Sequence, residues 1–124
     1  MSSLLKKAFL NAKKENRPAL LTYTVAGDNT KKKSLEILKS ISNFADICEL
    51  GFPHNTPIAD GGQIQTSSYR AIKNGIKIND VFSIAKNFKK SKKNTIIVVN
   101  SCGDAKKDRD ILKNRLGKIW NYHR

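Results

Sequence analysis

The chain has 124 residues, 39% of them hydrophobic, and carries a formal net charge of +14. This length suits one domain around one core and excludes a second autonomous domain. The apolar runs are too short for a membrane-spanning helix, which needs about 20 apolar residues, and for a signal peptide, so we expect a cytoplasmic protein with no membrane partner.

The strong basic charge is compatible with a nucleic-acid binder, but the type of basic residue argues against one. The sequence holds 19 Lys and 5 Arg, whereas phosphate and base recognition favours the forked arginine side chain. The lysine runs at 31–33, 89–90 and 92–93 contain no aromatic residue that could stack on a base. We therefore interpret the lysines as a solvated surface and predict no nucleic-acid partner.

The two cysteines, Cys48 and Cys102, do not suggest a metal site. They lie far apart in the sequence, and neither belongs to a spacing typical of metal ligands. Cys48 lies in an apolar run, where a free cysteine usually acts as a small hydrophobic residue. We expect both thiols to be reduced and structural.

The first half of the chain predicts one helix between two strands. The β-branched and aromatic run 19–25 predicts the first strand. A helix capped by Asn29 or Thr30 should follow and extend to about residue 42. The apolar run 45–50 then predicts the second strand.

A long loop and two helices are predicted next. Prolines and glycines make residues 51–62 a loop, and loops of this length in compact domains are usually functional. Helical spacing predicts one helix at about 63–73 and another at about 78–88, the latter capped by Asn79 or Asp80.

The last elements are a strand and a helical tail. The continuous apolar run 95–99 is typical of a strand buried on both faces of a parallel sheet. Apolar residues then recur at helical spacing up to residue 124, after a potential cap at Asp104. Strands that alternate with helices imply right-handed parallel crossovers, so the sequence predicts an α/β fold.

Two carboxylates follow the second predicted strand. Glu49 lies at its carboxyl end and Asp60 in the loop beyond it, the region where parallel α/β folds collect reactive groups. An apolar setting disfavours the charged form of Glu49, whereas Asp60 should stay ionised, so the two can act as an acid/base pair. Position alone leaves another reading open: Glu49 faces water or pairs with a lysine, and Asp60 forms a turn or caps a helix.

The residues around these carboxylates form a characteristic run. Residues 49–53 read Glu-Leu-Gly-Phe-Pro, residues 57–61 read Pro-Ile-Ala-Asp-Gly, and Ile64-Gln65 follow. This run resembles the signature of the tryptophan synthase alpha chain family. The resemblance covers about residues 8–98, and it includes Arg70, Ala71 and Gly75.

The resemblance implies a TIM barrel, of which this chain would form a part: three parallel strands with covering helices. It also implies a lyase of tryptophan biosynthesis that cleaves indole-3-glycerol phosphate into indole and glyceraldehyde 3-phosphate by a retro-aldol reaction, without a cofactor. The family's partner is the tryptophan synthase beta subunit, in an α2β2-type assembly.

The resemblance also implies roles for individual residues. Glu49 matches the glutamate that moves protons, and Asp60 the aspartate that faces the indole nitrogen. Tyr23 matches an aromatic residue that lines the indole pocket, although packing in the core is an equally good reading. The loop with Pro53 and Thr56 matches a region that contacts the beta subunit, but there Asn55-Thr56 replaces the usual Ser-Asp pair and His54 an aromatic residue.

The resemblance ends after Val98, and residues 99–124 form a divergent tail. We therefore expect a single, incomplete TIM-barrel-type domain over 1–124, because a complete barrel needs about 250 residues. Its phosphate site is usually built by loops after the seventh and eighth strands. The alternative to a lyase is thus a non-catalytic fragment that associates with a partner subunit or with itself.

Overall fold

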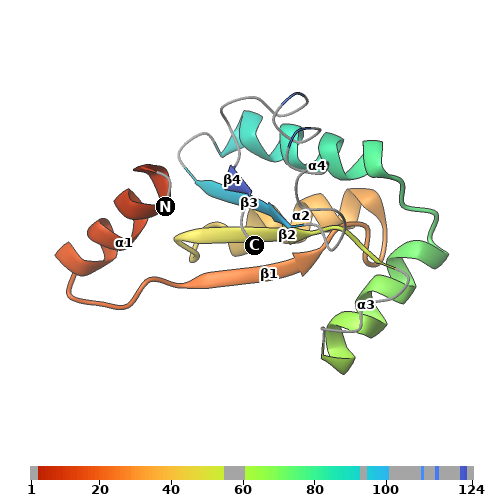
Figure 1. The fold of residues 1–124 in the computed structure, drawn as a ribbon, viewed down its shortest axis with the longest axis horizontal. Coiled ribbons are helices and arrows are strands. Elements are labelled where there is room, and N and C mark those ends of the chain that lie inside the picture. Colours follow the sequence, from red (N-terminus) through yellow and green to blue (C-terminus); the bar gives the residue numbers. More distant parts are fainter. Residues whose placement is uncertain are drawn as a thin grey trace.

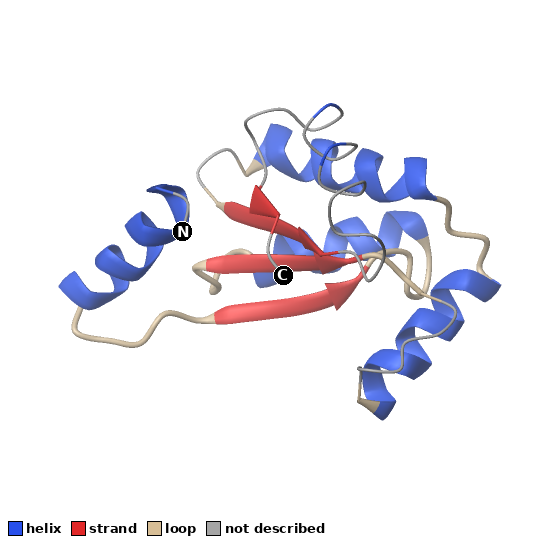
Figure 2. Cartoon of the chain, in the orientation of Figure 1, coloured by secondary structure: helices blue, strands red, loops and turns tan. Residues whose placement is uncertain are grey.

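The computed structural model of the chain describes residues 3–54, 61–92, 95–100, 110, 114 and 121–122. Its centre is a parallel sheet in the order β1-β2-β3-β4 (Figure 2). The strands are β1 (Leu21–Val25), β2 (Ile47–Gly51), β3 (Ile96–Asn100) and β4 (Asn121–Tyr122). The helices are α1 (Ser3–Lys14), α2 (Lys31–Ile41), α3 (Gly62–Lys73) and α4 (Ile78–Ser91). The predicted α/β class, with three parallel strands and covering helices, is confirmed.

Helices α2 and α4 cover one face of the sheet, which we call the outer face (Figure 1). Side chains alternate between the two faces along each strand, and the outer set packs with α4 in the main core. Its fully buried members include Cys48, Leu50, Ile97, Val99 and Phe88. Cys48 is a free thiol in this core, as predicted, and burial raises its pKa.

The opposite, inner face carries Tyr23, Glu49 and Val98, which are neighbours across β1, β2 and β3. Helix α1 lies at the amino ends of the strands (Figure 1), where Ala8 packs with Ile47 and Val98 in a smaller apolar cluster. The inner face is therefore apolar at the amino ends of the strands, and Glu49 is the central residue of β2.

The helix caps were predicted with mixed success. Thr30 caps α2, as expected, since its hydroxyl accepts the Lys33 N–H at 3.0 Å. The predicted cap of α4 at Asn79 or Asp80 is wrong: the helix begins after Lys77, and the Asp80 carboxylate in the first turn accepts the Lys77 N–H at 2.8 Å. A first-turn carboxylate stabilises the positive end of a helix just as a cap does, and the local pattern alone did not separate the two positions.

The described residues of the tail agree with the prediction in part: Asp110 and Asn114 are helical, as expected, whereas the end of the tail is not. Asn121 and Tyr122 form β4 and pair with Val98 and Val99 in parallel, although the spacing predicts a helix there. The edge of β3 presents backbone N–H and C=O groups, and a segment that pairs with them as a strand satisfies its own backbone groups as well. The predicted cap Asp104 and Cys102 lie outside the described residues.

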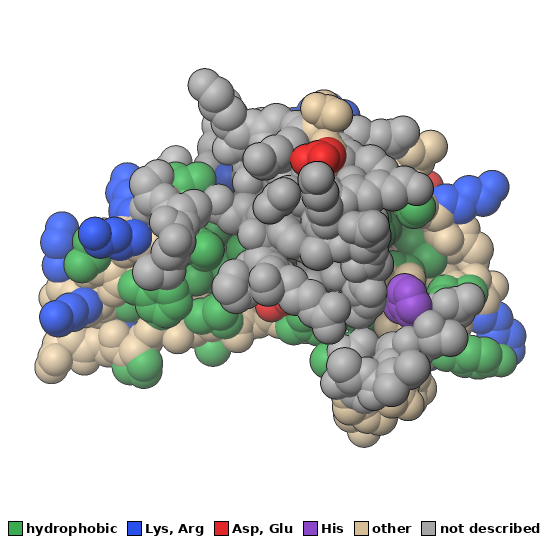
Figure 3. Space-filling model, in the orientation of Figure 1, with side chains coloured by type: hydrophobic (Ala, Val, Ile, Leu, Met, Phe, Trp, Pro, Cys, Tyr) green, Lys and Arg blue, Asp and Glu red, His purple; other side chains and the backbone are tan. Residues whose placement is uncertain are grey.

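The basic residues form no single patch on the face that Figure 3 presents. The described Lys and Arg side chains lie toward the two ends of that view. This distribution agrees with a solvated surface. No described helix is both long enough and apolar enough to cross a membrane.

Candidate functional site

Glu49 lies on the inner face between two strands. In the sheet register it pairs with Tyr23 on β1 and with Val98 on β3. Tyr23 and Glu49 are both half-buried, so each is partly screened from water and still accessible. The structure thus brings together the predicted proton-moving residue and the predicted pocket residue.

Gly51 makes room for the Tyr23 ring. A Cβ atom at Gly51 would overlap the hydroxyl oxygen and Cζ of Tyr23. The ring consequently leans along the inner face toward the carboxyl end of β2, because the missing side chain leaves that space. Tyr23 therefore lines the inner face and is not enclosed in the main core, which lies on the other side of the sheet.

Helix α3 is fixed to the turn after β1. The Arg70 guanidinium donates two hydrogen bonds to the Asp28 carboxylate, both of 2.8 Å, and these bonds lower the pKa of Asp28. Asn74 at the end of α3 donates to the Asn29 carbonyl oxygen. The chain that follows α3 therefore lies against the turn, and α3 extends beyond the carboxyl ends of the strands (Figure 1).

Gly27, in the turn after β1, lies very close to Ile76, which follows α3. Gly27 has a φ of +81°, and a Cβ atom there would lie less than 3.0 Å from three carbon atoms of Ile76. The Gly27 N–H donates to the Ser34 hydroxyl at 3.1 Å. Only glycine combines a positive φ with the close approach of Ile76 without strain.

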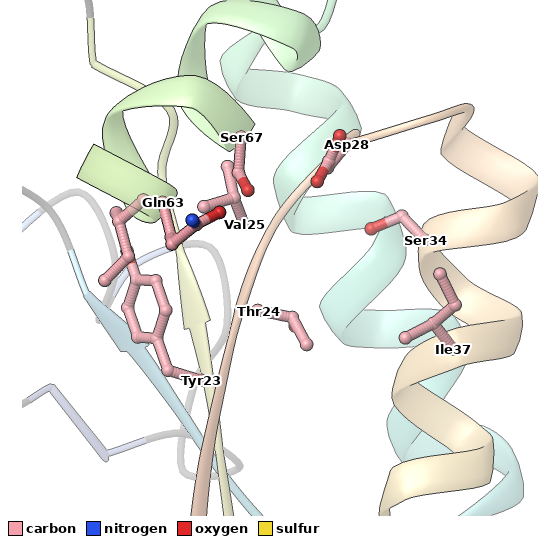
Figure 4. A pocket seen from close by; sticks show the side chains of 9 residues that line it. Tyr23, Thr24, Val25, Asp28, Ser34, Ile37, Gln63 and Ser67 are labelled. Carbon is pink, nitrogen blue, oxygen red and sulfur yellow. The ribbon is translucent and has the colours of Figure 1, made fainter. Parts of the chain in front are cut away.

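A pocket of about 280 Å³ lies between β1, α2 and α3 (Figure 4). Its lining is mixed, with apolar and hydrogen-bonding side chains. The lining residues are Tyr23, Thr24, Val25, Asp28, Ser34, Ile37, Gln63, Ile64 and Ser67. In Figure 4 Gln63 lies above the Tyr23 ring, so α3 closes the pocket on the side of the inner face.

Sequence reasoning missed part of this arrangement. Gln63, Ser67 and Arg70 have helical spacing, which places them on one side of α3, but nothing local showed that this side faces β1. The ion pair between Asp28 and Arg70 joins residues 42 positions apart. The sequence identified Arg70 only as a position that matches the family.

The remaining predicted site residues are described in part. Pro53 and His54 are half-buried after β2. Asp60 and Thr56 lie outside the described residues, although α3 begins at Gly62, two positions after Asp60. Among the described residues, no group of three His, Cys, Asp or Glu side chains is placed to hold a metal ion.

A parallel sheet with helices on its outer face and a carboxylate on an inner-face strand is typical of the (β/α)-barrel class. The family is identified by comparison with known proteins. A family model described as "Tryptophan synthase alpha chain" matches residues 9–104, and the chain belongs to this family.

Individual relatives agree with this assignment. The chain is 74% identical over 97 residues to the tryptophan synthase alpha chain of Pelagibacter ubique, a match that covers 78% of this chain and 37% of the relative. A solved mutant alpha subunit from Pyrococcus furiosus matches with a TM-score of 0.75 and 35% identity, over 83% of this chain and 43% of that one.

A structure of the Pyrococcus furiosus tryptophan synthase α2β2 complex matches with a TM-score of 0.64 and 42% identity, over 67% of this chain and 35% of that one. The predicted partial TIM barrel is therefore confirmed. The chain spans little more than a third of the length of the relatives that it matches.

Proposed function

We propose that this chain contributes the acid/base half of an active site that cleaves indole-3-glycerol phosphate. Glu49 would move the protons, Asp60 would face the indole nitrogen, and Tyr23 would line the indole pocket. The observation that carries the proposal is the position of Glu49, half-buried on the inner face and in register with Tyr23.

The chemistry needs one proton to enter and one to leave. A proton added to carbon C3 of the indole ring leaves a positive charge on the ring nitrogen. Loss of the proton from the hydroxyl group on the adjacent chain carbon forms the aldehyde and breaks the carbon–carbon bond, whose electrons return to the ring. The products are indole and glyceraldehyde 3-phosphate, so atoms and charge balance without a cofactor.

The two carboxyl groups suit these steps. A protonated Glu49 can give its proton to the ring and accept the hydroxyl proton, which returns it to its starting state. Proton transfer by a positioned side chain contributes about 10²- to 10⁴-fold in rate. An ionised Asp60 would stabilise the positive charge on the nitrogen, because fixed opposite charge lowers the energy of a charged transition state.

Assembly with a tryptophan synthase beta subunit belongs to the same proposal. The loop with Pro53 and Thr56 would supply the contact, and one of the matched structures is an α2β2 complex. We also place the protein in the cytoplasm, because the family consists of soluble biosynthetic enzymes.

Indole release tests the function. The purified chain would be incubated with indole-3-glycerol phosphate, alone and with a beta subunit. We expect indole to form, and Glu49→Gln to lower its rate at least about 100-fold. Glu36→Gln is the matched control, because Glu36 is an exposed residue of α2 and should leave the rate unchanged.

The second candidate function is association without catalysis. It is favoured by the length of the match, since 37% of the Pelagibacter ubique relative is covered and the phosphate-holding loops of TIM barrels come late in the chain. Absence of indole release under both conditions would exclude the lyase activity of this chain and leave association as its function.

A further inference from the structure

The turn after β1 holds the second half of α3 by polar contacts. The Asp28 carboxylate accepts two hydrogen bonds of 2.8 Å from the Arg70 guanidinium, and the Asn29 carbonyl oxygen accepts one from the Asn74 side chain. The Ser67 hydroxyl, one turn before Arg70 on the same helix, accepts a further bond from the guanidinium at 3.2 Å. The guanidinium is therefore fixed both by its own helix and by the turn.

The same turn contacts the chain beyond α3. A Cβ atom at Gly27 would lie less than 3.0 Å from carbon atoms of Ile76. The Lys31 ammonium, at the start of α2, lies 3.0 Å from the Asp80 carboxylate in the first turn of α4. Residues 27–31 thus contact the chain on both sides of the corner between α3 and α4, and we call them the β1 clamp.

Helix α3 has few contacts besides those with the β1 clamp. Of its 12 residues, all of them described, Ser68 and Ala71 are the buried ones. Tyr69 and Ile72 expose 66% and 41% of their surface, and Gly61 provides no side-chain cap. Two small buried side chains remove little apolar surface from water, so the orientation of α3 depends on the β1 clamp.

The first turns of α3 face Tyr23. Gln63, Ile64 and Ser67 line the same pocket as Tyr23, and Figure 4 shows Gln63 above the Tyr23 ring. Gln63 and Arg70 are seven residues apart, which is about 10 Å along a helix. A tilt of about 10° at Arg70 would move the Gln63 end by about 2 Å. A misplacement of about 1 Å in a site can cost about 10²-fold in rate.

We propose that Arg70 is a positioning residue of the candidate site: through Asp28 it holds the first turns of α3 over Tyr23 and so determines how tightly the pocket closes on a flat aromatic ring such as indole. This inference rests on the proposed function, since indole is the ring of the proposed substrate. Arg70 is not among the residues that line the pocket, so it acts through the helix and not by contact with the ring.

Indole itself is the probe for the test. The whole 124-residue chain is titrated with indole and followed by nuclear magnetic resonance, which gives the Kd and shows whether the Tyr23 and Gln63 signals shift. Arg70→Lys keeps the positive charge but cannot form the two parallel bonds to Asp28. We expect this variant to bind indole at least fivefold more weakly than the unchanged chain.

Arg17→Lys is the matched control. Arg17 makes the same kind of paired contact with Asp46, at 2.8 and 2.9 Å, but near the amino ends of β1 and β2. The same exchange of residue types there should leave the indole affinity unchanged. Circular dichroism establishes that each variant is folded during the titration, so a loss of affinity confined to Arg70→Lys does not come from unfolding.

A double-mutant cycle tests the path through Asp28. Asp28→Asn removes the charge of the partner and should weaken indole binding to a similar degree as Arg70→Lys. Because the two residues form one contact, their effects should not add: the double variant should bind indole no more weakly than the weaker of the two single variants. Additive losses would mean that Arg70 does not act through Asp28, and would overturn the inference.

The outcomes separate this inference from the lyase function. Weaker indole binding by Arg70→Lys, with unchanged binding by Arg17→Lys, supports the inference; failure of the unchanged chain to release indole from indole-3-glycerol phosphate would then contradict only the lyase function. Equal affinities of Arg70→Lys and the unchanged chain, equal losses in both arginine variants, or no indole binding by the unchanged chain would overturn the inference. If Arg70→Lys does not fold, Asp28→Asn takes its place in the comparison.

Discussion

The Tyr23 ring on β1 occupies the space that a side chain at Gly51 on β2 would fill. The two residues belong to neighbouring strands in register, so the absence of one side chain determines where the other lies. Since Tyr23 lines both the inner face and the pocket, this relationship shapes the candidate site.

Gly51→Ala should destabilise the fold by about 1–3 kcal/mol, because an added methyl group in a filled space forces its neighbours to move. Urea unfolding followed by circular dichroism measures the change. The cost should shrink by at least about 1 kcal/mol in a Tyr23→Ala background, where the ring is gone. If Gly51→Ala costs the same with and without the Tyr23 ring, the position of the ring does not depend on Gly51. Gly61→Ala is the control, since nothing lies within 4 Å of a Cβ atom there.

Gly27 and Gly75 form a second matched pair. Both have positive φ, +81° and +79°, but only a Cβ atom at Gly27 would meet Ile76. Gly75→Ala should cost about 1–2 kcal/mol, the strain of a left-handed residue with a side chain. Gly27→Ala should cost about 3 kcal/mol, because overpacking against Ile76 adds to the same strain. Equal losses in urea unfolding would mean that the contact with Ile76 adds nothing.

Asp46 makes stability depend on acid pH. The Arg17 guanidinium contacts its carboxylate at 2.8 and 2.9 Å, and the Leu20 N–H donates to it at 2.8 Å. These bonds lower the pKa of Asp46 from 3.8 to about 2, and the bonds from Arg17 contribute more than the bond from Leu20. Since the folded pKa is below the unfolded one, the contribution is complete above about pH 4 and is lost as pH falls toward 2.

Asp46→Asn should therefore lower stability at neutral pH by about 1 kcal/mol, a small value because solvent screens the exposed Arg17 partner. The free energy of unfolding of this variant should also fall less between pH 4 and pH 2 than that of the unchanged chain. Urea titrations at several pH values measure both effects. The control Glu36→Gln should show neither the loss at neutral pH nor the smaller fall in acid. If the acid dependence of stability is unchanged in Asp46→Asn, other carboxylates cause that dependence.

The ion pair between Asp28 and Arg70 should hold α3 in place. Arg70→Lys cannot form the two parallel bonds, so the amides of α3 should exchange several-fold faster by mass spectrometry. Protonation of Asp28 should also speed the exchange of the α3 amides. Because the bonds from Arg70 lower the pKa of Asp28, the exchange rates of the unchanged chain and of Arg70→Lys should become similar only well into the acid range. Lys73→Arg, which exchanges the same two residue types at an exposed position of the same helix, is the matched control and should leave the exchange unchanged. Unchanged exchange in Arg70→Lys would assign the docking of α3 to Asn74 and Ile76.

The sequence by itself determined the strands, most helix positions and the family. Apolar runs place β1, β2 and β3 to within a few residues, and Thr30 identifies the start of α2. These features are local, since strand and helix periods and caps involve residues close together in the chain. The family signature around Glu49 is local in the same way. The start of α4 at about residue 78 was predicted, but its cap was not, because a carboxylate such as Asp80 is favourable both as a cap and in the first turn.

Only the tertiary structure decided which distant residues meet. It aligns Tyr23 with Glu49, places the Tyr23 ring against Gly51, and joins Asp28 to Arg70 across 42 positions. Such contacts depend on strand register and on the space left by neighbouring side chains, which no local pattern specifies. The sequence thus identified the carboxylate Glu49, and the fold decided which residues lie beside it.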